Sequence, residues 1–264
     1  MGSLLTWRSL GWTGFFGLVL CAWVALFAMN MDAGLNLLGR PMSMGVAEMG
    51  AHTHAHAHGA AGWGLGVVFS MWALMVAAMM LPTMVPALSV YDDLIRGADG
   101  TRAGWFGVIA GYGLAWLGAA ALLGLAQVWL SSLGVVSDLG ASRSGWLNAA
   151  LLGGAGVYQF TRVKAHCHDK CRSPLAFYLG AWRPGLAGGG VMGLRMGLYC
   201  IGCCWPIMAL AFVGGVMNLI WMGIATLFMV IEKLPDLGRF VYRPAGVALV
   251  AAAVYTAASA ASFA

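Results

Sequence analysis

Three cysteines stand close together in one apolar stretch of the chain, Met196-Gly-Leu-Tyr-Cys-Ile-Gly-Cys-Cys-Trp-Pro206. If this stretch is helical, Cys203 and Cys204 each lie one turn from Cys200, and Met196 lies one turn earlier on the same side. Such soft sulfur ligands suit Cu(I) first and Zn(II) second. Free cysteine also packs as a small apolar side chain, but three cysteines at ligand spacing favour a metal site.

A second group of candidate ligands lies within residues 163–186 and consists of His166, Cys167, His168 and Cys171. A helical turn would place Cys167 and Cys171, four residues apart, on one face. Four nitrogen and sulfur ligands at this density could form one tetrahedral site, although the spacing is not that of a standard zinc finger. The basic residues nearby are Lys164, Lys170 and Arg172. They are expected to lower the pKa of the thiols, and they would also anchor the segment in the cytoplasm.

Methionines are frequent in residues 69–86. One helical face carries Met71, Met75 and Met79, and an adjacent row carries Met80 and Met84. Methionine commonly fills gaps in apolar cores, and for any single residue here that explanation is sufficient. The number of methionines keeps weak Cu(I) binding by thioethers open as the alternative. Pro82 and Pro86 are expected to bend the helix and free backbone carbonyls.

Residues 30–62 form the longest polar segment and contain four histidines that alternate with small residues, at His52, His54, His56 and His58. No core packing explains this pattern. Imidazole suits transition metals such as Cu(II), Zn and Ni, so the segment is a candidate for capturing a divalent ion. The alternative is a low-complexity tract with no specific role.

The composition places the elements that carry these residues in a membrane. The 264 residues are 61% hydrophobic and 9% charged, whereas soluble domains carry about 25% charged residues. Such a chain cannot cover a surface that faces water, so the lipid bilayer is its expected surrounding. The net charge of +5 is not a nucleic-acid signal, because no basic stripe with interleaved aromatic residues accompanies it.

We predict an all-α, polytopic transmembrane helix bundle that forms a single integral membrane domain over residues 1–264. Each spanning helix needs roughly 20 apolar residues, and helices are expected because an open sheet edge cannot lie in lipid. Seven segments qualify, with a count of six open because the fourth and sixth are short: about 11–29, 63–90, 104–131, 146–162, 188–214, 216–232 and 241–262.

The distribution of Lys and Arg predicts a cytoplasmic N-terminus. With seven spans, eleven of the 14 Lys and Arg residues lie on one side and only Arg40 and Arg143 on the other, and the positively charged side faces the cytoplasm. The His-rich segment 30–62 is then extracytoplasmic and the Cys/His segment 163–186 cytoplasmic. Glu232 and Lys233 would close the sixth span at the inner surface, where they could pair with each other or extend toward water.

Small residues predict how the cysteine-bearing helix packs. Gly189, Gly193 and Gly197 recur every four residues, the spacing that lets two membrane helices approach closely. Cys200 and Cys204 continue this stripe. The cysteines are therefore expected to face a neighbouring helix and not lipid.

Several motifs together resemble one known family over roughly residues 65–240. They are Met71-Trp72 with Ala78-Met-Met-Leu-Pro-Thr-Met84, Lys164 with Cys167 and Cys171-Arg-Ser-Pro174, Trp182-Arg183, Tyr199-Cys200 with Gly202-Cys-Cys-Trp205, Gly215-Val-Met-Asn218 with Trp221-Met222, and Glu232-Lys233 with Pro235. The family is the bacterial domain of unknown function 2182, predicted metal-binding integral membrane proteins that are sometimes labelled copper chaperones. The resemblance implies a multi-pass protein of the bacterial inner membrane that handles copper.

These observations favour an integral membrane protein that binds, transfers or transports copper as Cu(I), with zinc as the second choice of metal. None of the phosphate-binding signatures of an ATP-driven pump is present in the sequence. Two alternatives stay open, a membrane oxidoreductase that uses the metal or the thiols, and a subunit or assembly factor of a larger metalloenzyme. Whether the chain is an enzyme is left open. Expected partners are a copper chaperone or a metalloenzyme, and self-association is a further option.

Overall fold

The protein is built almost entirely from helices. The computed structural model describes residues 2–42, 64–97, 100–234 and 238–262, and in these ranges the extended backbone is limited to two isolated bridges. The elements are α1 (Gly2–Asp32), α2 (Leu65–Met80), the 3-10 turn η1 (Pro82–Met84), α3 (Val85–Gly97), α4 (Arg102–Ser132), α5 (Gly145–Tyr158), α6 (Arg162–Arg172), α7 (Pro174–Ala181), α8 (Gly185–Ala209), α9 (Ala211–Gly214), α10 (Leu219–Lys233) and α11 (Gly238–Ser262). The predicted all-α class is confirmed.

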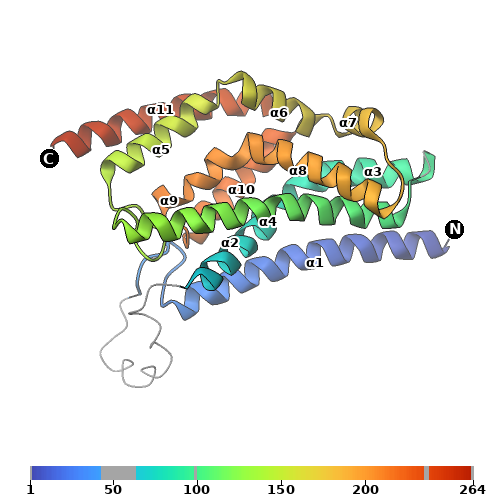
Figure 1. Cartoon of the computed structure of the whole chain (residues 1–264), viewed down its shortest axis with the longest axis horizontal. Coiled ribbons are helices and arrows are strands. Elements are labelled where there is room, and N and C mark those ends of the chain that lie inside the picture. Colours follow the sequence, from blue (N-terminus) through green and yellow to red (C-terminus); the bar gives the residue numbers. More distant parts are fainter. Residues whose placement is uncertain (1, 43–63, 98–99, 235–237, 263–264) are drawn as a thin grey trace.

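Five helical stretches in the described ranges are long and apolar enough to cross a membrane: Arg8–Asp32, Leu65–Ile95, Arg102–Ser132, Gly185–Gly214 and Phe240–Ser262. Each corresponds to one of the seven predicted segments. The other two predicted segments, 146–162 and 216–232, correspond to α5 and α10, which have 14 and 15 residues. These two helices are shorter than the roughly 20 residues that a spanning helix needs. Figure 1 shows the long helices side by side, with the two ends of the chain at opposite ends of the bundle.

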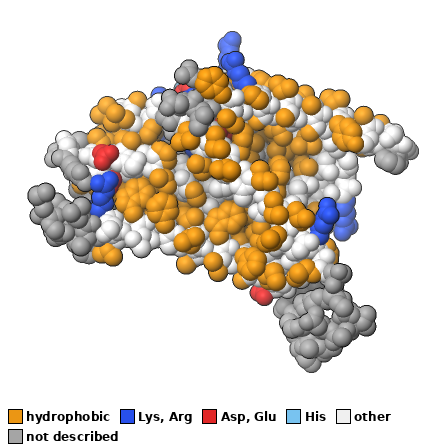
Figure 2. Space-filling model, turned by 180° about the vertical axis from the view of Figure 1, so that it is seen from behind, with side chains coloured by type: hydrophobic (Ala, Val, Ile, Leu, Met, Phe, Trp, Pro, Cys, Tyr) orange, Lys and Arg blue, Asp and Glu red, His pale blue; other side chains and the backbone are white. Residues whose placement is uncertain are grey.

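The outer surface of the bundle is apolar. Large hydrophobic side chains such as Leu20, Leu122 and Val254 point outward and are 65%, 70% and 66% exposed. Figure 2 shows hydrophobic side chains spread over one whole face, with the Lys, Arg, Asp and Glu side chains at its margins. A continuous apolar surface of this extent is what a protein surrounded by lipid presents.

Prolines free backbone carbonyls inside the bundle, and side chains from other helices satisfy them. Pro82 has no N–H to donate to Ala78, whose carbonyl oxygen accepts a hydrogen bond from Trp23 Nε1 at 3.2 Å. In α8, Pro206 cannot donate to Gly202, whose carbonyl oxygen accepts one from the Tyr158 hydroxyl at 2.5 Å. Away from water, each carbonyl left unpaired would cost several kcal/mol. The hydrogen bond that the helix loses at Pro82 is therefore replaced by one from Trp23.

The closest helix packing in the fold joins α4 to α8, and glycines on both helices make it possible. A Cβ atom at Gly189 or Gly193 would overlap the backbone of Gly104 or Val108, and one at Gly111 would overlap the backbone of Gly190. The predicted small-residue stripe of α8 therefore lies against α4. This close contact fixes the register of α8 and thus the position of the cysteines further along the same stripe.

We expect Gly193→Ala to lower the free energy of unfolding by about 1–3 kcal/mol, because overpacking a tight contact forces backbone shifts. The matched control is Gly113→Ala, since nothing lies within 4 Å of a Cβ added there. Alanine at that position should be neutral or stabilising, because glycine in a helix interior costs roughly 0.5–1 kcal/mol relative to alanine. Thermal unfolding of the purified chains in detergent measures both effects. Equal stability of the two variants would contradict the packing assigned to Gly193.

The Cys/His segment 163–186, which lies between two of the predicted spans, contains most of the short helix α6 and all of α7. Thr161 begins α6 because its hydroxyl accepts a hydrogen bond from the backbone N–H of Lys164 at 3.2 Å, which is the usual role of an N-cap threonine. Pro174 is the first residue of α7, a position that favours proline. The helical form of α6 sets which of its side chains face the bundle.

Candidate metal centre

Three thiols of α8 meet in the centre of the bundle. Cys200, Cys203 and Cys204 are each 1% exposed, and their Sγ atoms all lie within 4.8 Å of one another. The Sγ atoms of Cys203 and Cys204 are 3.3 Å apart, and all the cysteines of the chain are free. This thiol cluster (Cys200, Cys203 and Cys204) is the only group of three or more His, Cys, Asp or Glu ligands at such distances in the described part of the chain.

A fourth thiol reaches the cluster from α6. Cys171 Sγ lies 4.0 Å from Cys203 Sγ, although 32 residues separate them in the sequence. Sulfur ligands about 2.3 Å from one ion lie at most about 4.6 Å from each other. The Cys171 sulfur is therefore within reach of an ion bound at Cys203, although it is not one of the three mutually close thiols.

An ammonium group lies directly beside the thiol cluster. Lys233, near the end of α10, is 6% exposed and donates hydrogen bonds from Nζ to Cys200 Sγ at 2.9 Å and to Thr83 Oγ1 at 2.7 Å. The Tyr112 hydroxyl completes the group, 3.0 Å from Cys200 Sγ and 3.2 Å from Thr83 Oγ1. A buried cation needs a compensating anion, so this arrangement favours negative charge on the Cys200 sulfur.

The broken helix between α2 and α3 supplies the remaining polar contacts. At η1 the N–H of Met84 donates to Leu81 O and not to Met80 O. The Met80 carbonyl is thereby free to accept hydrogen bonds from Thr83 Oγ1 at 2.7 Å and from the Tyr112 hydroxyl at 3.2 Å. The break predicted from the prolines therefore positions Thr83 beside Lys233.

A buried ion pair attaches α6 to α10 next to the thiols. Lys164 Nζ lies 2.5 Å from Glu232 Oε1, and the two side chains are 3% and 1% exposed. His168 Nε2 donates to the backbone carbonyl of Glu232 at 2.8 Å. The expectation that Glu232 and Lys233 pair with each other or extend toward water is wrong, because Glu232 pairs with Lys164 and Lys233 turns to Cys200.

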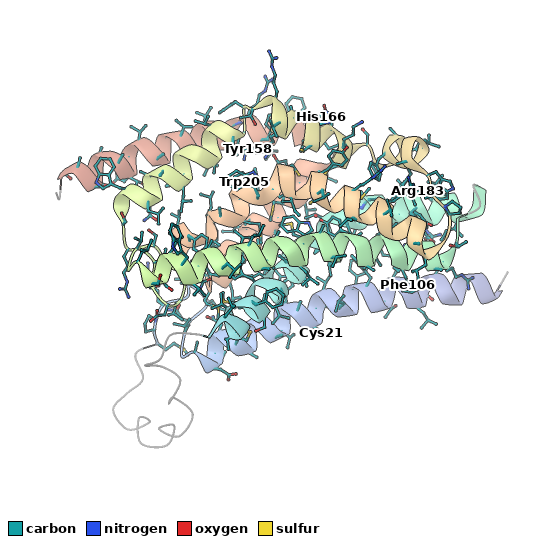
Figure 3. The ribbon with its side chains drawn as sticks, in the orientation of Figure 1. Cys21, Phe106, Tyr158, His166, Arg183 and Trp205 are labelled. Carbon is teal, nitrogen blue, oxygen red and sulfur yellow. The ribbon has the colours of Figure 1, made fainter. Side chains whose placement is uncertain are left out.

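The four predicted ligands of α6 do not converge on one point. Cys171 contacts the thiol cluster, His168 is used by Glu232, and His166 is exposed beside the ring of Tyr199. Figure 3 shows His166 on α6 at the outer side of the bundle. Successive residues of a helix point about 100° apart, so His166, Cys167 and His168 cannot share one side. Cys167 does face inward, as a Cβ at Gly202 would lie 2.6 Å from its Sγ.

The expected lowering of the thiol pKa in α6 is also wrong. Burial raises the pKa of Cys167, and the hydrogen bond with Cys200 raises the pKa of Cys171 well above its usual value. Burial likewise lowers the pKa of His168, against the opposing effect of Glu232. Desolvation disfavours the charged form of each group. Both α6 thiols are therefore protonated near neutral pH, and His168 is neutral.

The methionines predicted as ligands are buried in the bundle. Each is at most 5% exposed: Met71, Met75, Met79, Met80, Met84 and Met196. They belong to the same apolar core as the thiol cluster, so they face protein and not lipid, and binding of copper by their thioethers stays a prediction. The four histidines His52, His54, His56 and His58 lie outside the described residues.

Sequence reasoning gave Thr83 and Tyr112 no role in the site, and it assigned Lys164 to the thiols of α6 and not to Glu232. Their contacts with Lys233, Cys200 and Glu232 join positions 150, 88 and 68 residues apart, which no local spacing reveals. One signal was available. Glu232 and Lys233 are charged residues at the end of an apolar segment, and ionisable groups at membrane depth mark functional sites.

The thiol cluster is a donor set made only of soft sulfur, which suits Cu(I) more than hard cations. A family model described as "PpoB2: Copper chaperone" matches residues 69–256 of the chain. The match covers every residue of the site described above, from η1 to α10. No curated protein and no solved structure matches the chain.

Proposed function

Because the chain belongs to the PpoB2 copper chaperone family, we propose that it is an integral membrane protein that binds Cu(I) in the bundle and passes it to an acceptor. The observation that carries this proposal is the thiol cluster. Cys200, Cys203 and Cys204 are completely buried, close together and free of disulfides. Packing alone gives no reason to gather sulfur around a buried ammonium group.

The choice of Cu(I) over Zn(II) is supported by the chemistry of the donors. Structural zinc sites take four ligands, which can be thiolates, imidazoles or carboxylates, whereas only three thiol sulfur atoms of the described residues lie within 4.8 Å of one another. The buried imidazole of α6, His168, donates its Nε2 hydrogen to the Glu232 carbonyl and is therefore committed elsewhere. The carboxylate of Glu232 is paired with Lys164.

Residence in a membrane is supported by the five long apolar helices and by the apolar outer surface. In the proposed orientation, in the bacterial inner membrane with a cytoplasmic N-terminus, α6 lies on the cytoplasmic side and the acceptor approaches there. The His-rich segment would capture copper on the opposite side. A cation moving inward along this route gains roughly 2.3 kcal/mol per 100 mV of membrane potential, so transfer needs no nucleotide.

The test is an anaerobic titration of the metal-free chain in detergent with Cu(I), in competition with a coloured Cu(I) chelator. We expect roughly one tightly held Cu(I) per chain, since the three sulfur atoms of the thiol cluster lie close enough together to bind one ion. X-ray absorption of the loaded protein should show sulfur as the nearest ligand. Cys21→Ser is the matched control, because Cys21 is an exposed thiol on α1 (Figure 3) and should have no effect. Failure of the wild-type chain to compete with the chelator would contradict the proposal.

A further inference from the structure

The thiols of α6 differ from those of α8 in burial. The cluster thiols of α8 are 1% exposed, whereas Cys167 and Cys171 are both of intermediate exposure. Cys171 lies 4.0 Å from Cys203, Sγ to Sγ. Cys167 precedes it by one helical turn, and residues four apart on a helix lie on the same face. The sulfur atoms therefore extend from the centre of the bundle to a helix at its edge.

Gly202 leaves room for the Cys167 side chain beside α8. A side chain at this position would meet Cys167, since a Cβ there would lie 2.6 Å from the Cys167 Sγ atom. Pro206 has no backbone N–H to donate to the Gly202 carbonyl, which accepts a hydrogen bond from the Tyr158 hydroxyl instead. The neighbourhood of α8 that carries the thiol cluster is therefore shaped to receive Cys167 beside it.

The ion pair and the His168 bond hold α6 in place. Lys164 contacts Glu232, and His168 donates to the carbonyl of the same residue. Both attachments lie on the inward stripe of α6 that also carries Cys167 and Cys171. Because α6 is fixed at this distance, an ion can change sulfur partners without movement of the helix.

Resting on the proposed function, we propose that Cys171 and Cys167 form a second, transient Cu(I) position through which the ion leaves the thiol cluster. In the first step a Cu–S bond to Cys171 forms and a bond to Cys203 or Cys204 breaks. The proton of the Cys171 thiol passes to the departing sulfur, and copper stays Cu(I) throughout. In the second step Cys167 takes the place of the remaining α8 sulfur in the same way. From there an acceptor with its own thiols or thioethers removes the ion.

The test separates equilibrium binding from the rate of release. Wild type, Cys171→Ser, Cys167→Ser and Cys21→Ser are loaded anaerobically with one equivalent of Cu(I), and release to an excess of the soluble chelator bicinchoninate is followed by absorbance. We expect both α6 variants to hold Cu(I) with the wild-type equilibrium affinity. Their release should be at least about tenfold slower, which corresponds to 1.4 kcal/mol in the barrier. Cys21→Ser should release at the wild-type rate.

Each other outcome overturns the inference. Wild-type release rates in both α6 variants would mean that copper leaves by another route, while the proposed function would stand. Loss of equilibrium binding in Cys171→Ser, with a helical content equal to that of wild type by circular dichroism, would make Cys171 a permanent ligand and not a transfer ligand. Failure of the wild-type chain to load would contradict the proposed function itself.

Discussion

Replacing Cys200, Cys203 and Cys204 together by serine should abolish retention of Cu(I). Hydroxyl groups are hard, weak ligands for Cu(I), and loss of even an outer-shell partner typically costs 10–100-fold in metal affinity. Loss of three direct ligands should therefore weaken binding by more than about 100-fold. Metal analysis of the purified, chelator-washed chain, with copper and zinc both measured, gives the result.

The triple variant needs a matched control for folding. Serine is close to cysteine in size, and a helical content and melting temperature near those of wild type would show that the bundle is intact. Cys21→Ser should retain the full complement of copper, because Cys21 lies on α1 away from the site. If the triple variant kept the same metal as wild type, the assignment of the site to α8 would be wrong.

Glu232→Ala should destabilise the fold by about 3–5 kcal/mol, because removing one partner of a buried ion pair leaves the other charge uncompensated. The charge left behind is the ammonium of Lys164, whose side chain is 3% exposed. The same substitution frees α6 from α10, so Cys167 should react faster with a maleimide. Unfolding in detergent, followed by circular dichroism, measures the loss of stability.

The double variant Lys164→Met with Glu232→Leu distinguishes a charge effect from a packing effect. Replacing both members of a buried pair with apolar residues of similar volume is often neutral, so the double variant should recover most of the stability lost in Glu232→Ala. If the single and double variants were equally unstable, the loss would reflect packing and not the unpaired charge. A single variant as stable as wild type would show that the pair does not hold α6.

The sequence was informative wherever neighbours along one helix decide the structure. Hydropathy located the helices, and the spacing of Cys200, Cys203 and Cys204 placed three sulfurs at ligand distance. Glycine spacing correctly predicted that α8 packs tightly against another helix, although it could not name α4. These patterns depend on the 3.6-residue period alone.

Contacts between helices could not be predicted from the sequence, because the helical period does not say which helices pack together. Closeness in sequence groups Cys171 with His166 and His168, but His166 lies on the outer face of α6. The inward face of α6 carries Lys164, Cys167, His168 and Cys171. Where that face lies depends on how α6 docks on α8 and α10. Likewise, the pairing of Lys233 with Cys200 and not with Glu232 follows from the docking of α10.

The buried ammonium of Lys233 has a consequence for which ions the centre accepts. A monovalent ion held by two thiolates forms a complex with a single negative charge, which the ammonium neutralises. A divalent ion held by the same two thiolates forms a neutral complex, and it balances the lysine charge only when a third thiol is also ionised. The lysine therefore sets how many thiols must lose a proton for each metal, although it never touches the ion.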